Sequence, residues 1–220
     1  MVIIMIKEVF GDYIWKSKLD NNFVEEYKNE FNSRITDNNS ITTESWDSCN
    51  VSSSFFNNEL VMNCLSVDFN GIFSKKILDE LKIFFMELEK LDENINRIVD
   101  VELIISKIWY NNYNNGDFQE IHDHSGNGGG MRSFYSFVYI FKSTNKKGDA
   151  RLVFDNPRGS FFRNMAISEI VKVNNYANKY IPGLNEGELI IFPSHMKHYV
   201  TCHKNKDDNR ITISGNISTY

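Results

Sequence analysis

Apolar residues recur at helical spacing in two segments of the first half of the chain. In the stronger segment, 74–91, Ser74 is a suitable N-cap and charged residues occupy the opposite face. Its apolar stripe consists of Ile77, Leu78, Leu81, Phe84, Phe85, Leu88 and Leu91. The second segment, 20–31, starts with the capping residues Asp20, Asn21 and Asn22. Its apolar side consists of Phe23, Val24, Tyr27 and Phe31. The spacing predicts two amphipathic helices whose stripes are packing faces.

The pattern changes to short strands from residue 100 onward. Runs rich in β-branched and aromatic residues occupy 101–110, 134–141, 150–154, 189–192 and 210–214. Turn residues separate them at 115–116, 126–130, 147–148, 156–157 and 182–183. Regularly spaced short strands of this kind are typical of a sandwich or barrel. We therefore expect a mainly β protein with flanking helices (α+β), in which the helices buttress a sheet from outside.

Length and linker content predict one domain over 1–220, with an N-terminal helical and strand support region, 1–99, and a core, 100–220. The apolar start, 1–7, is too short for a signal peptide and is interpreted as a first strand. No window approaches the roughly 20 apolar residues that cross a bilayer, so no membrane association is expected.

Composition narrows the classes of function further. The net charge of −5 argues against a sequence-independent nucleic-acid binder, although it leaves a local basic patch open. The 3 cysteines, Cys49, Cys64 and Cys202, share no metal-binding or redox spacing. A disulfide framework is not expected, and a reducing cytoplasm suits this composition best. The chain also lacks the serine-hydrolase elbow and the phosphate-binding loop.

All 5 histidines lie between 122 and 203. Because residues i and i+2 of a strand share a face, His122 and His124 can reach one ion while Asp123 points away. His198 follows an apolar strand and a turn, which suits a third ligand from a neighbouring strand. Imidazole ligands suit iron, zinc, copper or nickel, and three of them leave about half of an octahedral sphere open. His195 and His203 have no comparable placement and are interpreted as surface residues.

Arg210 begins the last predicted strand. A planar guanidinium can pair both oxygens of a carboxylate, so an arginine near a metal could hold a dicarboxylate. An exposed strand arginine is the alternative. A two-metal nuclease or hydrolase would recruit several carboxylates, and no dense acidic cluster surrounds these histidines.

Together these motifs resemble the 2-oxoglutarate/Fe(II) oxygenases of bacteria and phages, which are relatives of the prolyl-hydroxylase-like enzymes. The resemblance covers about 109–216 and rests on Trp109-Tyr-Asn111, Gly116-Asp-Phe-Gln119, His122-Asp-His124, Tyr135–Tyr139, Gly187–Ser194, His198-Tyr-Val200 and Arg210–Asn216. It implies a double-stranded β-helix, or jelly roll. If the protein is phage-encoded, the cytoplasm expected from its cysteine content is that of the host.

The resemblance also implies a set of site residues. Iron would be held by His122 and His198, with His124 as third ligand where most of the wider superfamily has Asp or Glu. Asp123 could replace His124 only through a local bulge, because a one-residue change flips the face. Arg210 would bind the far carboxylate of 2-oxoglutarate, with Thr212 and Tyr139 as further donors.

Two residues that precede His122 and His124 in the chain have weaker assignments. Asn111 and Gln119 could orient substrate or a metal-bound imidazole if both face inward, and exposed loop positions are the alternative. Trp109 is interpreted as a core residue. Asn216 belongs to the quoted motif without an assigned role.

The implied reaction uses Fe(II), 2-oxoglutarate and O2 to hydroxylate a C–H bond, releasing succinate and carbon dioxide. The sequence leaves the oligomeric state and the substrate open; the substrate could be a peptidyl residue, a small molecule or a nucleotide base.

Two other functions remain. One is a cupin-type protein with a three-histidine metal site and no 2-oxoglutarate, in which Arg210 has no role. The other is a non-catalytic binding relative.

Overall fold

The structure is a computed structural model. It describes residues 4–35, 51–54, 71–91, 102–125, 127–128, 131–164 and 178–219. Parts of three predictions lie outside these residues: the first three residues of the predicted first strand, most of the glycine-rich run 126–130, and both Cys49 and Cys64. In the described part, no helix is long and apolar enough to span a membrane.

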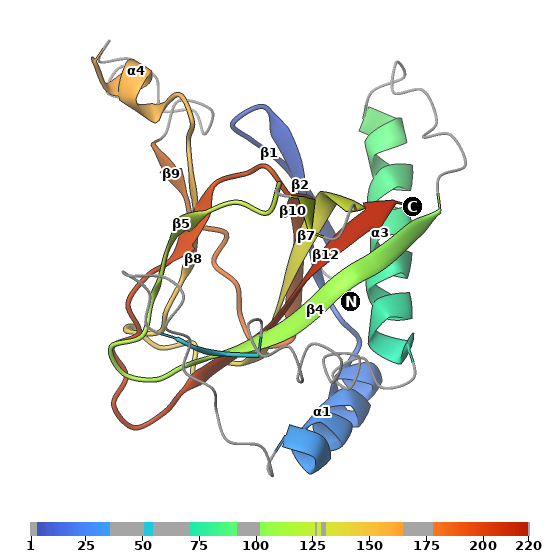
Figure 1. Cartoon of the computed structure of the whole chain (residues 1–220), viewed down its shortest axis with the longest axis vertical. Coiled ribbons are helices and arrows are strands. Elements are labelled where there is room, and N and C mark those ends of the chain that lie inside the picture. The colour runs from blue at the N-terminus through green and yellow to red at the C-terminus, as the bar shows by residue number, and fades with distance from the viewer. Residues whose placement is uncertain are drawn as a thin grey trace.

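Two antiparallel sheets form the body of the protein (Figure 1). The larger sheet has the order β1 (Ile4–Val9), β2 (Asp12–Lys18), β10 (Glu188–Pro193), β7 (Met131–Lys142), β12 (Arg210–Thr219), β4 (Leu103–Tyr113) and β3 (Ser52–Ser53), with β6 (Asn127–Gly128) paired to β7. The smaller sheet has the order β5 (Gln119–His122), β11 (His198–Val200), β8 (Leu152–Asp155) and β9 (Lys179–Tyr180). The two sheets enclose an apolar core to which Ile140, Phe192 and Phe154 contribute. The prediction of a mainly β jelly roll with flanking helices is confirmed.

Helices cover the outer face of the larger sheet. They are α1 (Asn21–Ile35) and α3 (Ile72–Leu91), and a short α4 (Gly159–Asn164) lies at the far end of the molecule (Figure 1). The Asp20 carboxylate caps α1 by accepting the Phe23 amide at 2.8 Å, and this bond holds the pKa of Asp20 below its usual value. Both predicted helices are confirmed within a few residues at each end.

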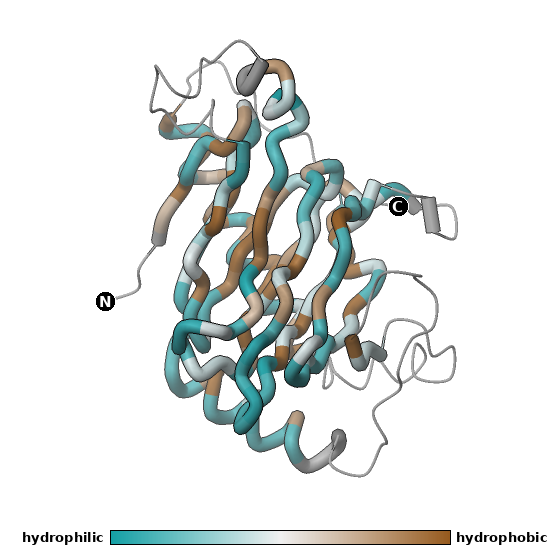
Figure 2. The backbone as a smooth tube through the Cα atoms, turned by 90° about the vertical axis from the view of Figure 1, so that its left-hand side faces the viewer, coloured by the Kyte–Doolittle hydropathy of each residue, from teal (hydrophilic) through white to brown (hydrophobic). Residues whose placement is uncertain are grey.

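The apolar stripe of α3 packs on the sheet as predicted. Ile77, Leu81 and Phe84 are fully buried and belong to one cluster with residues of β2, β7, β10 and β12. Leu91 departs from the prediction, because this last residue of the helix is 62% exposed. Figure 2 shows the hydrophobic segments running along the strands and the hydrophilic ones at the turns between them.

The N-terminal half also supplies strands to the larger sheet. β1 and β2 form a hairpin, and β2 pairs with β10, so that Trp15 lies opposite Ile191. The larger sheet is therefore built from both halves of the chain. The helices cover one of its faces, and the smaller sheet lies against the other.

β12 lies in the middle of the larger sheet, between β7 and β4. Ile213 and Ile217 belong to the cluster on the helix side. Strand alternation therefore turns Arg210, Thr212 and Asn216 toward the smaller sheet. At Gly215 a Cβ would lie 2.5 Å from the Phe137 ring and 2.7 Å from the Lys107 carbonyl oxygen, so only glycine lets these groups come so close.

Candidate metal centre

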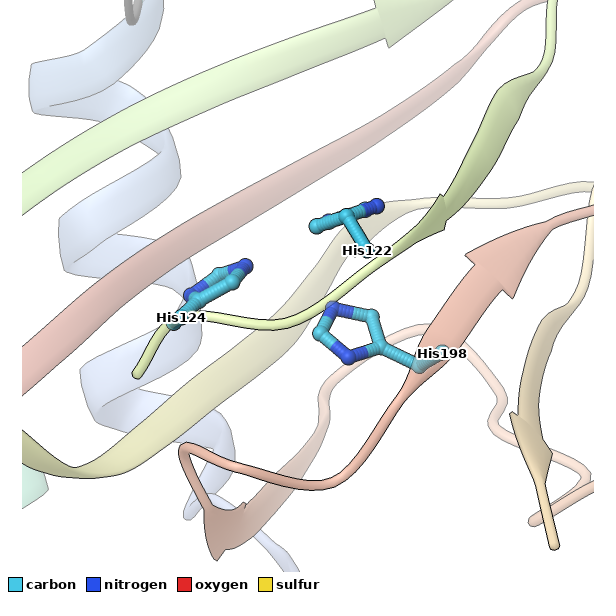
Figure 3. A group of neighbouring side chains, drawn as sticks. All are labelled: His122, His124 and His198. Atoms are coloured by element: carbon cyan, nitrogen blue, oxygen red, sulfur yellow. The ribbon is translucent and has the colours of Figure 1, made fainter. Parts of the chain in front are cut away.

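Three imidazoles gather at one end of the smaller sheet. His198 and His122 are directly opposite each other in the β11–β5 pair, and His124 follows two residues later in a bend. Ring centroids are 4.4 Å apart for His122 and His198, and 5.0 Å apart for His124 and His198. One ring nitrogen from each of the three lies within 4.8 Å of the others (Figure 3). This is the only spatial group of three or more His, Cys, Asp or Glu ligand atoms among the described residues.

Each imidazole uses its Nδ1 atom in a hydrogen bond to an oxygen. His122 Nδ1 lies 2.7 Å from the Glu120 carbonyl and His198 Nδ1 lies 2.9 Å from the Met196 carbonyl. His124 Nδ1 lies 2.8 Å from Asn216 Oδ1. A carbonyl or amide oxygen only accepts, so each Nδ1 carries the proton and donates it. The three Nε2 atoms consequently keep their lone pairs, which is the tautomer a metal requires.

Burial keeps these histidines neutral. Desolvation is the main cause that lowers the pKa of His122, lowers that of His124 to about 4, and holds that of His198 well below its usual value. The neighbouring imidazoles lower the pKa of His124 and His198 further. A metal would therefore meet little competition from protons at neutral pH.

Aromatic rings surround the histidine group. The Trp109 ring centroid lies 5.6 Å from that of His124, and Phe192 lies 5.0 Å from His198. Trp109 is only 5% exposed, in agreement with its predicted core position, but its ring also forms part of the site wall. These rings limit the directions in which the imidazoles can turn.

Asp123 is exposed and lies outside the histidine group. Its Oδ1 atom accepts the Ser125 hydroxyl at 2.6 Å and the Ser125 amide at 3.1 Å, which lowers the pKa of the carboxyl group. The local backbone thus turns His124 toward the other imidazoles and Asp123 away from them.

Arg210 is buried at the start of β12, with 3% of its surface exposed. The guanidinium lies over the Tyr113 ring, 5.5 Å from its centroid. Its Nη1 atom has no hydrogen-bond partner among the described residues. Burial lowers the pKa of Arg210, while Tyr113 and Asp149 act in the opposite direction. The alternative of an exposed strand arginine is excluded, and the guanidinium retains capacity for an anion.

Thr212 and Asn111 share the inward face with Arg210. Thr212 is buried, and its hydroxyl lies 3.5 Å from Asn111 Nδ2, at the limit of a hydrogen bond. The Asn111 Oδ1 atom is buried without a described partner. Gln119 accepts the Tyr113 hydroxyl at 2.6 Å, which links strand β5, which carries His122, to the ring under Arg210.

The structure corrects the expectation for Tyr139. Its ring packs on Phe73 of α3 at 5.6 Å and on Tyr27 of α1 at 6.3 Å, on the helix side of the sheet. Strand alternation places it on the opposite face from Thr212 and Arg210, so its hydroxyl does not point toward the site.

The expectation for His203 is also corrected, because this residue is fully buried. Its Nδ1 atom accepts the Ala150 amide at 3.1 Å and its Nε2–H donates to the Asp208 carbonyl at 3.0 Å. His195 is exposed, as predicted, and pairs with Asp12.

Sequence reasoning missed the serines behind His124. The Ser136 hydroxyl lies 3.2 Å from His124 Nδ1 and 3.1 Å from Asn216 Oδ1. A serine in an otherwise apolar strand such as Phe134–Phe141 was the available signal, since a buried hydroxyl needs a partner.

One cavity borders Arg210. It has a volume of about 250 Å³ and is also lined by Leu152 and Leu184, but by none of the three histidines.

Comparison with known proteins relates this geometry to a family. Residues 107–216, half of the chain, match the model of a family described as "Putative 2OG-Fe(II) oxygenase". No curated protein sequence matches the chain.

Two solved structures share the fold at low sequence identity, and a third is similar over part of the chain. A prolyl-4-hydroxylase from Pseudomonas putida is 12% identical, with a TM-score of 0.52 over 94% of this chain and 92% of that one. HygX from Streptomyces hygroscopicus, with nickel and 2-oxoglutarate bound, is 8% identical, with a TM-score of 0.50 over 93% and 82%. A 2OG-Fe(II) oxygenase family oxidoreductase from Burkholderia pseudomallei is 13% identical, with a TM-score of 0.40 over 55% of this chain and 47% of that one. The chain thus spans about half of the Burkholderia protein.

Proposed function

The chain belongs to the 2OG-Fe(II) oxygenase family whose model it matches, and from this premise we propose that it is a dioxygenase dependent on Fe(II) and 2-oxoglutarate. The reaction would hydroxylate a C–H bond of a peptidyl residue or a small molecule. When bound, Fe(II) and 2-oxoglutarate supply the redox chemistry, in which O2 is reduced by the oxidation of 2-oxoglutarate to succinate and CO2 and by the oxidation of the substrate C–H bond.

The histidine group suits Fe(II). His122, His124 and His198 offer three Nε2 lone pairs from neutral rings, and imidazole is a favoured ligand of iron. Three protein ligands leave positions open for a bidentate cosubstrate and for O2. Because all three ligands are neutral, the site keeps the full double positive charge of the ion, which favours an anionic cosubstrate.

Arg210 is the observation that carries the assignment of 2-oxoglutarate. A buried guanidinium with an unpartnered Nη1 atom is costly, and a carboxylate would supply the missing acceptor. It lies on the same inward face of β12 as Asn216, which contacts His124. In this proposal Arg210 pairs with the far carboxylate of 2-oxoglutarate and the Thr212 hydroxyl donates to the same group.

Two alternatives have less support. A cupin-type metal protein without 2-oxoglutarate would use the histidines but would leave the buried guanidinium of Arg210 without an anion to bind. A non-catalytic relative would need neither the unprotonated Nε2 atoms nor the buried cation. Binding and turnover of 2-oxoglutarate distinguish all three functions.

The first experiment measures 2-oxoglutarate binding to the Fe(II)-loaded protein without oxygen, followed by succinate release after oxygen is admitted. Arg210→Leu should weaken 2-oxoglutarate binding about 30-fold or more, since losing one partner of a buried charge pair costs about 2 kcal/mol or more. The matched control is Arg158→Leu, an exposed arginine whose Nη2 atom donates to the Phe10 carbonyl at 3.0 Å. It should bind 2-oxoglutarate as the wild type does.

Fe(II)-loaded wild type that binds no 2-oxoglutarate would overturn the proposal in favour of a cupin-type site. Binding without succinate release, with any candidate peptide or metabolite, would favour a non-catalytic relative.

A further inference from the structure

His124 is held differently from the other two imidazoles. His122 and His198 each donate to a carbonyl two residues earlier in the chain, so their own backbone fixes them. His124 follows the end of β5, in a bend, and donates to Asn216, which lies 92 positions later in the sequence. The orientation of this third ring therefore depends on a residue of the larger sheet.

Asn216 is itself held in place. It lies on β12, opposite Lys107 of β4 and Ser136 of β7, so both neighbouring strands fix its backbone. Its Oδ1 atom accepts from the Ser136 hydroxyl at 3.1 Å as well as from His124 at 2.8 Å. The amide oxygen is thus turned toward the imidazole by groups on a rigid strand.

A chain of serines continues from Ser136. Its hydroxyl lies 2.8 Å from that of Ser194, which lies 2.7 Å from that of Ser133. Each hydroxyl has one proton to donate, and because Ser136 donates to Asn216 Oδ1, it accepts from Ser194. The Ser194 carbonyl also accepts the His124 amide at 2.8 Å. The network thus holds both the backbone and the ring of His124.

We propose that Asn216 is the positioning residue of the third ligand: by accepting Nδ1–H of His124 across the two sheets, it selects the tautomer and ring orientation that direct Nε2 toward the metal. This rests on the proposed function, because it assumes that the histidine group binds a metal. Without the Asn216 oxygen, the nearest hydrogen-bonding group to His124 Nδ1 is the Ser136 hydroxyl at 3.2 Å. This hydroxyl can donate to Nδ1, so that the ring carries its proton on Nε2, where it blocks coordination.

The experiment uses two substitutions at Asn216 and one control. Asn216→Leu removes the acceptor with little change in volume. Asn216→Asp keeps an acceptor at the same place. Ser218→Ala is the matched control, because it removes a buried hydroxyl bond on the same strand, 2.7 Å from the Ser106 hydroxyl, without touching His124.

The first readout needs no metal. In protein with ¹⁵N-labelled histidine, NMR distinguishes protonated from unprotonated ring nitrogens. We expect the Nδ1–H form of His124 in the wild type, Asn216→Asp and Ser218→Ala, and the Nε2–H form or a mixture in Asn216→Leu.

The second readout is anaerobic titration with Co(II) alone, followed by its ligand-field absorption. Asn216→Leu should bind Co(II) about 10- to 100-fold more weakly, as is usual when the hydrogen-bond partner of a metal ligand is lost. Asn216→Asp should restore wild-type affinity or exceed it, and Ser218→Ala should match the wild type. If Asn216 had only a structural role, Asn216→Asp would not restore the Co(II) affinity.

The outcomes separate the two proposals. If the wild type binds Co(II) and Asn216→Leu binds it equally well with the same His124 tautomer, the inference on Asn216 is wrong while the proposed function stands. If Asn216→Asp binds no better than Asn216→Leu, acceptance by Oδ1 is not the cause and the inference is again wrong. If the wild type binds neither Co(II) nor Fe(II), the proposed function fails, and the inference with it.

Discussion

At the residue scale, hydrogen bonds decide what the three histidines can do. A neutral imidazole has one proton, and its position determines which nitrogen can coordinate. The spacing of His122, His124 and His198 predicted that they could meet. The sequence could not predict that each Nδ1 atom would find an oxygen, because one of those oxygens belongs to Asn216, far along the chain.

The lowered histidine pKa values predict how the metal-free protein responds to acid. The unfolded chain has ordinary histidines, which take up protons below about pH 6.5. Folded His124 stays neutral until about pH 4. The unfolded state therefore binds more protons between these limits, so stability should be flat above pH 6.5 and fall as the pH drops toward 4. His122 and His198 act in the same direction.

Urea unfolding of chelator-treated protein at several pH values measures this effect. The loss from His124 is on the order of 3 kcal/mol at most, at about 1.4 kcal/mol for each pKa unit. His124→Gln should have a shallower slope. Asp20 and Asp149 have lowered pKa values, so their contribution is lost only below about pH 4 and does not overlap this window. Equal stability at pH 7 and pH 5 would contradict the prediction.

At the scale of elements, long periodic segments were predictable and short ones were not. The helices α1 and α3 and the strands β4, β7, β10 and β12 lie where the hydrophobic pattern predicts them. β5, β9 and β11 have two to four residues each, too few for a period to show, although β5 and β11 carry two of the three histidines. Such short strands form because they pair with strands distant in sequence, and the local hydrophobic pattern carries no signal of that pairing.

The face of Tyr139 shows why alternation alone can mislead. β7 is buried on both faces, with Phe137 and Tyr139 toward the helices and Val138 and Ile140 toward the smaller sheet. When both faces are apolar, the sequence does not say which face borders the site. His203 is similar, because its burial depends on contacts with residues distant in sequence: its Nδ1 atom accepts the Ala150 amide and its backbone amide donates to the Asp117 carbonyl.

Tyr139→Phe should therefore leave 2-oxoglutarate affinity unchanged. The hydroxyl is buried without a described partner, so its removal should also leave stability unchanged or raise it by about 1 kcal/mol. Binding assays and thermal unfolding test both statements, with Thr212→Val as the comparison that should weaken 2-oxoglutarate binding. A Tyr139→Phe protein as impaired as Arg210→Leu would place the hydroxyl at the site after all.

At the scale of the whole molecule, the three-histidine group connects the two sheets. His122 and His198 belong to the smaller sheet, whereas His124 is tied to Asn216 of the larger sheet. A metal that binds all three ligands in the folded state, and not in the unfolded chain, adds its binding energy to the stability of the fold.

Metal binding should accordingly raise the melting temperature. At a free metal concentration 100 times the dissociation constant the gain is about 2.7 kcal/mol, which corresponds to a shift of roughly 5–10 °C for a domain of this size. Thermal unfolding with Co(II) and with a chelator measures it. His198→Ala should abolish the shift, whereas His195→Ala, at an exposed histidine paired with Asp12, should retain it. A shift of the same size in His198→Ala would place the metal elsewhere.

The regular alternation along β12 makes the length of this strand as important as its composition. Arg210, Thr212 and Asn216 face the smaller sheet, and Ile213 and Ile217 belong to the helix-side core. Deleting one residue near Ser214 would exchange the two rows on one side of the deletion. Isoleucine side chains would then face the smaller sheet, and either Arg210 or Asn216 would face the helix-side core. A substitution changes one position of β12 at a time, whereas an insertion or deletion within this strand would disrupt the candidate site and the core packing together.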